Sequence, residues 1–165
     1  MKISEALTAC GSDKCTVHSY GHFYDSIFAL HSIKSVLEIG IYKGASLKAL
    51  SMVDETIYAL GVDKQFVPGF TQVTATAPDF SPVVKYCDEN SRFFDLIIDD
   101  GSHLKRDQLQ GILALYRFLK PGGIYVIEDI QKESTATEFK IHGARILDLR
   151  AVKGRRDDVI AYWVK

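Results

Sequence analysis

The chain has 165 residues, of which 47% are hydrophobic and 25% charged, a composition typical of one soluble globular domain with a sizeable core. Its formal net charge of −1 gives no electrostatic reason to expect a nucleic acid or an anionic membrane as a partner. No apolar run approaches the roughly 18 residues of a membrane-spanning helix, so we expect no membrane partner either.

The cysteines favour a reducing compartment. Cys10, Cys15 and Cys87 are an odd number without the spacing of a disulfide framework. The residues that end at Cys10 have the look of a lipoprotein cleavage box, but Glu5 interrupts the stretch before it, and no apolar segment of about 7–15 residues precedes it. We therefore expect a cytoplasmic protein.

Residues 1–34 are predicted to form a helical cap segment. Aromatic and aliphatic residues recur at helical spacing from Tyr20 to Phe28, which indicates a helix that packs on a sheet or roofs a cofactor. The segment also contains the atoms of a possible zinc site, at Cys10, Cys15, His18 and His22. Both histidines fit the helical repeat, so we favour the helix.

Apolar runs and helical patterns alternate along the rest of the chain. Strands are predicted at Ser35–Gly40, Ile57–Val62, Val83–Cys87, Phe94–Ile98 and Gly123–Ile127. Helices are predicted at Ala45–Val53 and Gln108–Leu119, whereas residues 64–81 are irregular. Residues 144–152 and 158–165 close the chain as an antiparallel pair of strands.

This alternation predicts an α/β fold. Because the strands are apolar on both faces, they are expected in a mostly parallel, Rossmann-like sheet of seven strands with helices on both faces and an antiparallel last strand. We interpret residues 1–165 as one minimal domain, in which the core comprises residues 35–165. Such sheets bind ligands at the carboxyl ends of their strands, so the residues after each strand are the candidates for function.

The first strand ends in a loop with two glycines. Glu38 precedes Gly40, and Gly44 stands where the next helix begins, so a nucleotide-like ligand can approach the backbone at both glycines. Tyr42 replaces the middle glycine of a dinucleotide-binding loop, and no phosphate-binding lysine motif follows. A plain turn between strand and helix remains the alternative.

Two further acids follow predicted strands. Asp63 lies 23 residues after Gly40, close to the spacing of about 20 residues at which an acid accepts the ribose hydroxyls in dinucleotide-binding folds. Its alternative role is a helix cap or a loop acid. Asp88 follows the predicted third strand and is expected either to face an adenine edge or to belong to a plain turn.

The fourth and fifth strands end in a group of acids. Adjacent strands lie about 4.7–4.9 Å apart, so Asp100 and Glu128 should share one edge, with Asp129 beside them. Three oxygen donors suit Mg²⁺ or Mn²⁺, and without a cation one of the carboxyls should be protonated. Asp99 is expected to support the cofactor side or the loop, because consecutive strand residues face opposite ways.

His103 is the candidate general base, because a pKa of about 6.5 suits proton transfer near neutrality. A cation held by these acids would lower the pKa of a hydroxyl that coordinates it. In the alternative interpretation, Asp100 or Ser102 caps the next helix and His103 is solvated.

These motifs resemble known families. Glu38, Gly40, Tyr42, Gly44 and Asp63, with the strand order, resemble class I S-adenosylmethionine-dependent methyltransferases, and the tyrosine form of the loop is similar to that of metal-dependent O-methyltransferases. The stretches IDDGSHLKRDQ and LKPGGIYVIEDI resemble the macrolide-sugar O-methyltransferases of the mycinamicin and demethylmacrocin type. GSDKCTVHSYGHFYDSIF is similar to the signature that precedes the methyltransferase core of that family.

The resemblance implies a set of roles. S-adenosylmethionine is the implied cofactor, with Mg²⁺ or Mn²⁺ held by Asp100, Glu128 and Asp129 and with His103 as the base. The cofactor would contact the residues of the glycine loop, the acids after the strands and the cap segment, namely Glu38, Gly40, Tyr42, Gly44, Asp63, Asp88, Asp99, His18 and Tyr20. Asp13 and Lys14 would line the cofactor or substrate entrance.

The acceptor is expected to be smaller than a macrolide. The stretch QKESTATEFKIHG is too short for a full crossover helix with a lid, so the acceptor site should be open or completed by another subunit of a homo-oligomer. A hydroxyl of a sugar, a glycan or a small polyol is the expected substrate. A non-catalytic cofactor-binding module and a catechol-type O-methyltransferase of small phenols remain alternatives.

Overall fold

The computed structural model describes residues 1–165 and contains one sheet with the strand order β3-β2-β1-β4-β5-β7-β6. The strands are β1 (Ser35–Ile39), β2 (Tyr58–Asp63), β3 (Gln72–Thr74), β4 (Phe94–Asp99), β5 (Leu119–Ile127), β6 (Arg145–Asp148) and β7 (Val159–Val164). The pairs from β3 to β5 are parallel, and β7 runs antiparallel to both β5 and β6. The predicted seven-stranded, mostly parallel sheet with an antiparallel last strand is therefore confirmed.

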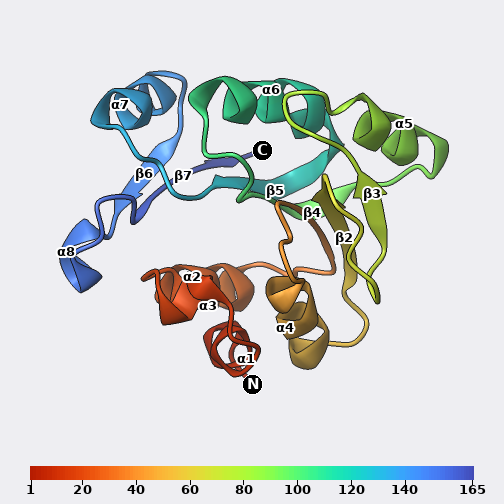
Figure 1. Ribbon diagram of the computed structural model, residues 1–165, viewed down its shortest axis with the longest axis horizontal. Coiled ribbons are helices and arrows are strands. Elements are labelled where there is room, and N and C mark those ends of the chain that lie inside the picture. Colours follow the sequence, from red (N-terminus) through yellow and green to blue (C-terminus); the bar gives the residue numbers. More distant parts are fainter.

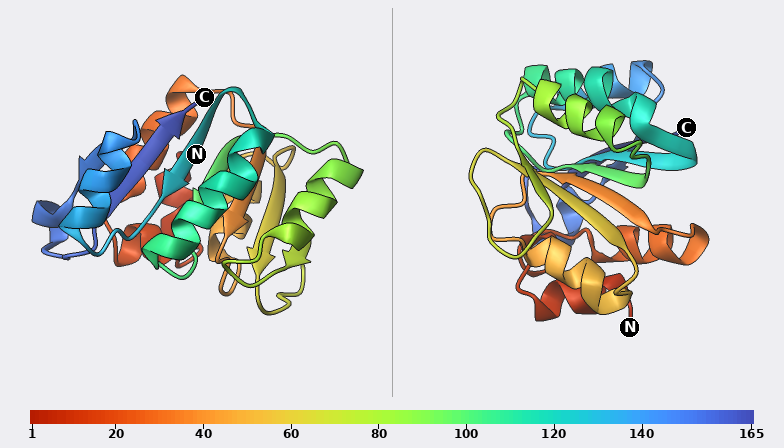
Figure 2. Two further views of the ribbon diagram at one scale, coloured as in Figure 1. Left: turned by 90° about the horizontal axis from the view of Figure 1, so that it is seen from above. Right: turned by 90° about the vertical axis from the view of Figure 1, so that its right-hand side faces the viewer.

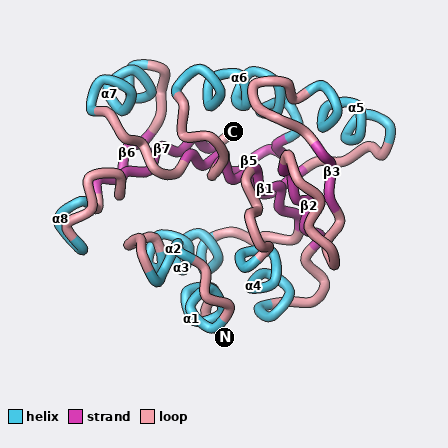
Figure 3. The backbone as a smooth tube through the Cα atoms, viewed as in Figure 1, coloured by secondary structure: helices cyan, strands magenta, loops and turns pink.

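Helices cover both faces of the sheet, as Figure 1 and Figure 2 show. One face carries α5 (Ser81–Glu89), α6 (Lys105–Leu115) and α7 (Glu133–Ile141). The other face carries α1 (Ile3–Ala9), α2 (Asp13–Thr16), α3 (Gly21–Leu30) and α4 (Ala45–Val53). A short α8 (Arg150–Lys153) lies beyond β6 at the edge of the sheet. Figure 3 shows the strands as one central layer between the two layers of helices.

Two hydrophobic cores fill the space between these layers. All five residues of β1 are buried, and its successive side chains alternate between the cores, Val36 in one and Leu37 in the other. This is the pattern expected of a central parallel strand that is covered on both faces. The aromatic stripe of α3 packs on the sheet, where Tyr24 is buried and Phe23 lies against Tyr162 of β7.

The predicted strand Val83–Cys87 is wrong, because these residues belong to α5. Pro82 lies in the first turn of this helix, where its missing N–H costs nothing. Val83 and Cys87 are both buried and four residues apart, so they form one helical stripe. The third strand is instead β3, which lies within the segment predicted to be irregular.

Other boundaries also moved. Helix α6 begins at Lys105 and ends at Leu115, and a 3₁₀ turn, Tyr116–Phe118, leads into β5. The strand predicted to reach Val152 ends at Asp148, because α8 follows it. Helix α7 forms the crossover, and β6 begins soon after it. No helix of the chain has the length and the apolar character needed to span a bilayer.

The atoms of the zinc site that was considered and not favoured are not brought together. Cys10 Sγ lies 3.3 Å from Met52 Sδ of α4, and His18 Nδ1 lies 2.6 Å from Asp158 Oδ1. The three cysteines are free.

Gly40 allows the loop after β1 to approach the loop after β4, and this contact can be tested. Its φ is +83°, and a Cβ there would lie 2.1 Å from the carbonyl oxygen of Asp100. Gly40→Ala is expected to lower the free energy of unfolding by about 3 kcal/mol or more, as the sum of backbone strain and the clash. Urea denaturation measures this change.

Gly122→Ala is the matched control, because Gly122 has a φ of +77° but no atom lies within 4 Å of the position that its Cβ would take. Only the backbone strain of about 1–2 kcal/mol is expected there. Equal losses for the two variants would show that the close approach at Gly40 is absent.

Candidate functional site

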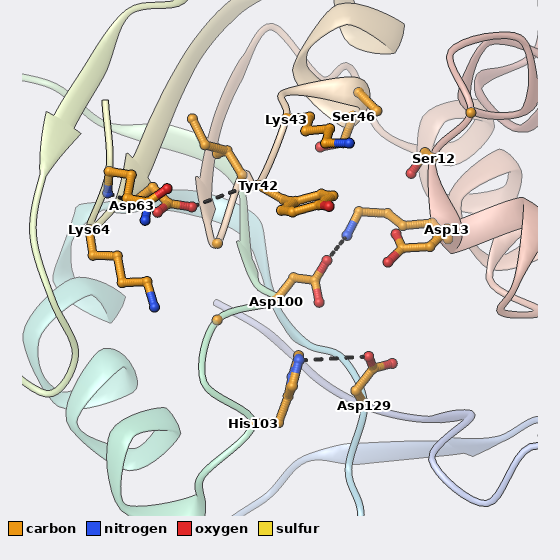
Figure 4. Close-up of a pocket in the computed structure, with 17 residues that line it drawn as sticks. Ser12, Asp13, Tyr42, Lys43, Ser46, Asp63, Lys64, Asp100, His103 and Asp129 are labelled. Carbon is orange, nitrogen blue, oxygen red and sulfur yellow. Dashed lines mark hydrogen bonds and ion pairs between the residues drawn. The ribbon is translucent and has the colours of Figure 1, made fainter. Parts of the chain in front are cut away.

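A cavity of about 540 Å³ opens at the carboxyl edge of the parallel strands. Its walls come from residues 11–14 of the cap segment, from the loops at 40–46, 63–65 and 100–103, and from Asp129. These loops follow β1, β2, β4 and β5, which is where ligands bind in open α/β sheets. In Figure 4, Tyr42 lies between Asp63 on one side and Asp100 on the other.

Strained backbone is concentrated in this cavity. Four non-glycine residues have a positive φ, and three of them, Tyr42 (+48°), His103 (+57°) and Asp129 (+54°), line the cavity. The left-handed region costs an ordinary residue about 1–2 kcal/mol, and such strain persists where the surroundings fix it, often at functional sites. The strain therefore points to this cavity as the functional site.

Asp63 organises one side of the cavity. Its Oδ2 accepts a hydrogen bond from the backbone N–H of Tyr42 at 3.1 Å, and its Oδ1 accepts one from Gln65 N–H at 3.1 Å. One carboxylate thus ties the loop after β1 to the loop after β2. Gly40 and Tyr42 line the same side, so these three predicted residues are brought together.

A second cavity, of about 240 Å³, adjoins this side. It shares Gly40, Asp63, Lys64 and Gly101 with the first cavity and extends along Ala75–Ala77. Sequence reasoning missed Ala75–Ala77. They directly follow β3, so the rule that functional residues follow strands would have found them if the third strand had been placed correctly.

Asp88 lines neither cavity. It lies in the last turn of α5, exposed, with its Oδ2 2.6 Å from the Arg117 guanidinium. The prediction that Asp88 follows a strand is wrong, because Val83–Cys87 belong to a helix. Glu38 and Gly44 belong to the glycine loop but do not line the cavity. Ser46 Oγ donates to Glu38 Oε2 at 2.5 Å, and Gly44 is the N-cap of α4.

Asp100, His103 and Asp129 meet on the opposite side of the cavity. Each offers one ligand atom, and these atoms lie within 4.8 Å of one another. His103 Nε2 is 3.9 Å from Asp129 Oδ2, and His103 Nδ1 is buried without a hydrogen-bond partner. Tyr20 Oη donates to Asp129 Oδ1 at 2.5 Å. Two carboxylates and one imidazole can hold a divalent cation or move a proton.

Glu128, the third predicted metal ligand, does not line the cavity, although it shares Lys14 with Asp100. Its side chain is 1% exposed, and Lys14 Nζ lies 2.6 Å from its Oε2, while Tyr24 Oη donates to its Oε1. Lys14 Nζ also lies 2.6 Å from Asp100 Oδ2 and 3.2 Å from Glu38 Oε1. Sequence reasoning placed Lys14 at the entrance but missed its pairing with the acids, because no local pattern links residues so far apart in the chain.

These charges perturb one another. Burial lowers the pKa of the Lys14 ammonium, but the charges of Asp100, Glu128 and Glu38 outweigh burial and raise this pKa well above its ordinary value. Burial also raises the pKa of the Glu38 carboxyl. Lys14 therefore stays charged at any physiological pH.

His18 and Tyr20 reach Asp129 and do not line the cavity. His18 Nδ1 lies 2.6 Å from Asp158 Oδ1 and 3.4 Å from Asp129 Oδ1, and the His18 ring stacks on Tyr20 with centroids 5.0 Å apart. Asp158, which is fully buried, was missed. It immediately precedes β7, and the start of an antiparallel strand lies at the same edge as the ends of its parallel neighbours.

Asp99 lines neither cavity, although it was predicted to support the cofactor side or the loop. It is 3% exposed, its Oδ1 accepts the Gly101 N–H at 3.3 Å, and its Oδ2 has no partner. The bond to Gly101 supports the loop after β4. Burial raises the pKa of Asp99 to about 7.

The chain was compared with known proteins. No family model matches it. It is 30% identical over 135 residues to the 8-demethyl-8-alpha-L-rhamnosyl tetracenomycin-C 2'-O-methyltransferase of Streptomyces olivaceus, a match that covers 73% of this chain and 35% of that protein. It is 29% identical over 128 residues to the demethylmacrocin O-methyltransferase of Streptomyces fradiae, covering 70% and 32%. The chain thus spans about a third of the length of these curated relatives.

Solved structures give a consistent result. The MycE methyltransferase from the mycinamycin biosynthetic pathway, in complex with Mg, SAH and mycinamycin VI, matches 78% of this chain and 39% of its own with a TM-score of 0.69 and 26% identity. Another crystal form, with Mg and SAH, matches 100% of this chain and 54% of its own, with a TM-score of 0.75 and 20% identity. The fold is therefore that of the Rossmann-like methyltransferases.

The buried Asp99 carboxyl predicts a pH-dependent stability. Its pKa is about 7 in the folded chain and about 3.9 when unfolded. Between these two pKa values the folded state holds a proton that the unfolded state has lost. The contribution of Asp99 to the free energy of unfolding therefore falls by about 1.4 kcal/mol per pH unit as the pH rises from about 4 to about 7.

Asp99→Asn removes this titration. Urea unfolding at pH 5 and pH 8 should show the variant gaining about 2–3 kcal/mol relative to the wild type at the higher pH. A difference between the two proteins that is constant with pH would contradict the assignment.

Proposed function

Because this chain is related in sequence and fold to class I S-adenosylmethionine-dependent methyltransferases of the macrolide-sugar type, we propose that it is a divalent-metal-assisted O-methyltransferase. Its acceptor is a hydroxyl of a sugar, a glycan or a small polyol. The observation that carries the proposal is one cavity in which the loop held by Asp63 faces the group of Asp100, His103 and Asp129.

S-adenosylmethionine fits the side of the cavity held by Asp63. Gly40 permits close approach of the ligand to the backbone, and the Asp63 carboxylate can accept hydrogen bonds from the two ribose hydroxyls. The adjoining cavity along Ala75–Ala77 is a site for the adenine base, because it continues from Asp63 and is lined there by small side chains. The sulfonium would then lie near Tyr42.

Asp100 and Asp129 are suited to Mg²⁺ or Mn²⁺. Mg²⁺ is commonly bound through one or two carboxylates, with waters and substrate oxygens as the other ligands. When bound, the metal would orient the acceptor hydroxyl and lower its pKa. Tyr20 orients Asp129 by a hydrogen bond to its Oδ1, and Lys14 orients Asp100 by a hydrogen bond to its Oδ2.

His103 is the proton acceptor in this proposal. Its Nε2 takes the hydroxyl proton, and Asp129 Oδ2, at 3.9 Å, stabilises the imidazolium that results. An oxygen lone pair attacks the methyl carbon in line, the carbon–sulfur bond breaks, and its electron pair remains on sulfur as a neutral thioether. Most of the acceleration comes from holding the two reactants together in this orientation.

The acceptor side is open. None of residues 130–144, which include α7, lines the cavity, so this crossover supplies no lid over it. We therefore retain the expectation that the acceptor site is either open or completed by a second subunit of a homo-oligomer. No nucleic acid or membrane partner is proposed, and the free cysteines fit a cytoplasmic location.

The cofactor site predicts a contrast between two aspartates. Asp63→Asn should weaken S-adenosylmethionine binding by about 10-fold or more, because hydrogen bonds to a charged group contribute about 1.5–3 kcal/mol. Asp88→Asn is the matched control and should leave the affinity unchanged, because Asp88 lies in neither cavity. Isothermal titration calorimetry measures both. A loss of affinity in Asp88→Asn, with none in Asp63→Asn, would reverse the assignment.

Methyl transfer from S-adenosylmethionine labelled on its methyl group tests the reaction. Sugars, nucleotide sugars and catechols should be compared, with Mg²⁺ and with a chelator. We expect transfer to a sugar hydroxyl that requires the metal, and a loss of about 10²–10⁴-fold in kcat for His103→Ala. Turnover of catechols alone would identify a phenol methyltransferase, and cofactor binding without any transfer would identify an accessory module.

A further inference from the structure

His103, the proton acceptor of the proposed reaction, has no side-chain hydrogen bond that orients its ring. Its Nδ1 is buried without a partner, and its Nε2 lies 3.9 Å from Asp129 Oδ2, which is beyond hydrogen-bond distance. Figure 4 shows the ring directed toward Asp129 across this gap. An imidazole that transfers protons is ordinarily oriented by a bond to its second nitrogen. The orientation of the His103 ring therefore depends on the backbone that carries it.

Side chains, rather than secondary structure, hold that backbone. Residues 101–103 make no backbone–backbone hydrogen bond. His103 has a φ of +57°, in the left-handed region, which an ordinary residue keeps only where its surroundings fix it. Before His103, Asp99 Oδ1 accepts the Gly101 N–H at 3.3 Å. This bond is long and acts two residues away, so it does not by itself fix the conformation at His103.

The side chain of Ser102 provides a closer restraint. Its hydroxyl donates to Asp107 Oδ2 at 2.7 Å, and its oxygen accepts the backbone N–H of Leu104 at 3.3 Å. Ser102 and Leu104 are the two chain neighbours of His103, so one hydroxyl spans this residue. A hydroxyl bond to a carboxylate is stronger than one between neutral groups. Asp107 is 5% exposed and lies in the first turn of α6, so the acceptor belongs to a packed helix.

We propose that Asp107 is a positioning residue of the reaction: it fixes Ser102 and thereby holds His103 in the left-handed conformation that presents its imidazole to the cavity. The inference rests on the proposed function, because it concerns the proton acceptor of that reaction. Asp107 lines neither cavity, so it acts through the loop and not by contact with the cofactor or the acceptor.

A purely structural role for Asp107 predicts a different result. An acid in the first turn stabilises a helix through the helix dipole. Glu133 occupies such a position in α7, on the same face of the sheet, and it also lines neither cavity. Glu133→Ala is therefore the matched control, because it removes a first-turn acid without touching the loop that carries His103.

The conformation of His103 can be measured without turnover. In NMR spectra, the one-bond coupling between Cα and Hα differs between a positive and a negative φ. The wild type, Asp107→Asn and Glu133→Ala should show the coupling of a positive φ at His103, whereas Asp107→Ala and Ser102→Ala should move it toward that of a negative φ. An unchanged coupling in Asp107→Ala and Ser102→Ala would overturn the proposal. Circular dichroism verifies that each variant is folded, and Ser102 is exposed, so its loss disturbs no core.

Methyl transfer provides the second test, with the acceptor that gives the highest turnover in the labelled-methyl assay. At saturating Mg²⁺ and S-adenosylmethionine, Asp107→Ala should lower kcat by about 10-fold or more, because a small displacement of a reacting group is costly. KM for S-adenosylmethionine should not change. Asp107→Asn should keep most of kcat, because its amide oxygen can still accept from Ser102. Glu133→Ala should leave kcat unchanged.

A double-mutant cycle separates positioning from a general loss of structure. In a His103→Ala background, Asp107→Ala should lower kcat no further, because the group that it positions is gone. A loss of the same size in both backgrounds would overturn the proposal.

The failure of this proposal and that of the proposed function are distinguishable. If the wild type transfers no methyl group to any acceptor, the proposed function is contradicted, and the role of Asp107 in it falls as well. If the wild type is active and Asp107→Ala has the same kcat, only the positioning role is wrong.

Discussion

The site depends on the ion pairs that the buried ammonium of Lys14 makes with three carboxylates. Strands β1, β4 and β5 bring Glu38, Asp100 and Glu128 to one edge of the sheet, where uncompensated carboxylates would repel one another. Lys14 places an opposite charge among them. Removing one partner of such a buried pair typically costs about 3–5 kcal/mol. The cap segment is therefore part of the site as well as a cover for the sheet.

The site has two sides that share one cavity. On one side, Asp63 accepts backbone hydrogen bonds from two loops and so fixes the strained loop that carries Tyr42. On the other side, Asp129 and His103 are also held in the left-handed region. The central strands of the sheet are buried on both faces, so they hold these strained loops in place. A donor on one side and an acceptor on the other would meet between them.

Sequence reasoning worked where a signal was local. Buried strands and the helix at Ala45–Val53 follow from apolar periodicity, and Asp63, Asp100 and Asp129 follow from the rule that ligands bind after strands. It failed at Val83–Cys87, because a short apolar run with spacing of four is ambiguous between strand and helix, and this error also misplaced Asp88. The pairings of Lys14 with Glu128 and of His18 with Asp158 depend on tertiary contacts that no periodicity encodes.

The central claim is that Asp100 and Asp129, which follow neighbouring strands, bind one divalent cation in the cavity. Anomalous diffraction at the manganese absorption edge, from crystals grown with Mn²⁺, locates this cation directly. The account predicts one anomalous peak about 2.0–2.3 Å from an oxygen of Asp100 and from an oxygen of Asp129. The absence of a peak between Asp100 and Asp129 would contradict it.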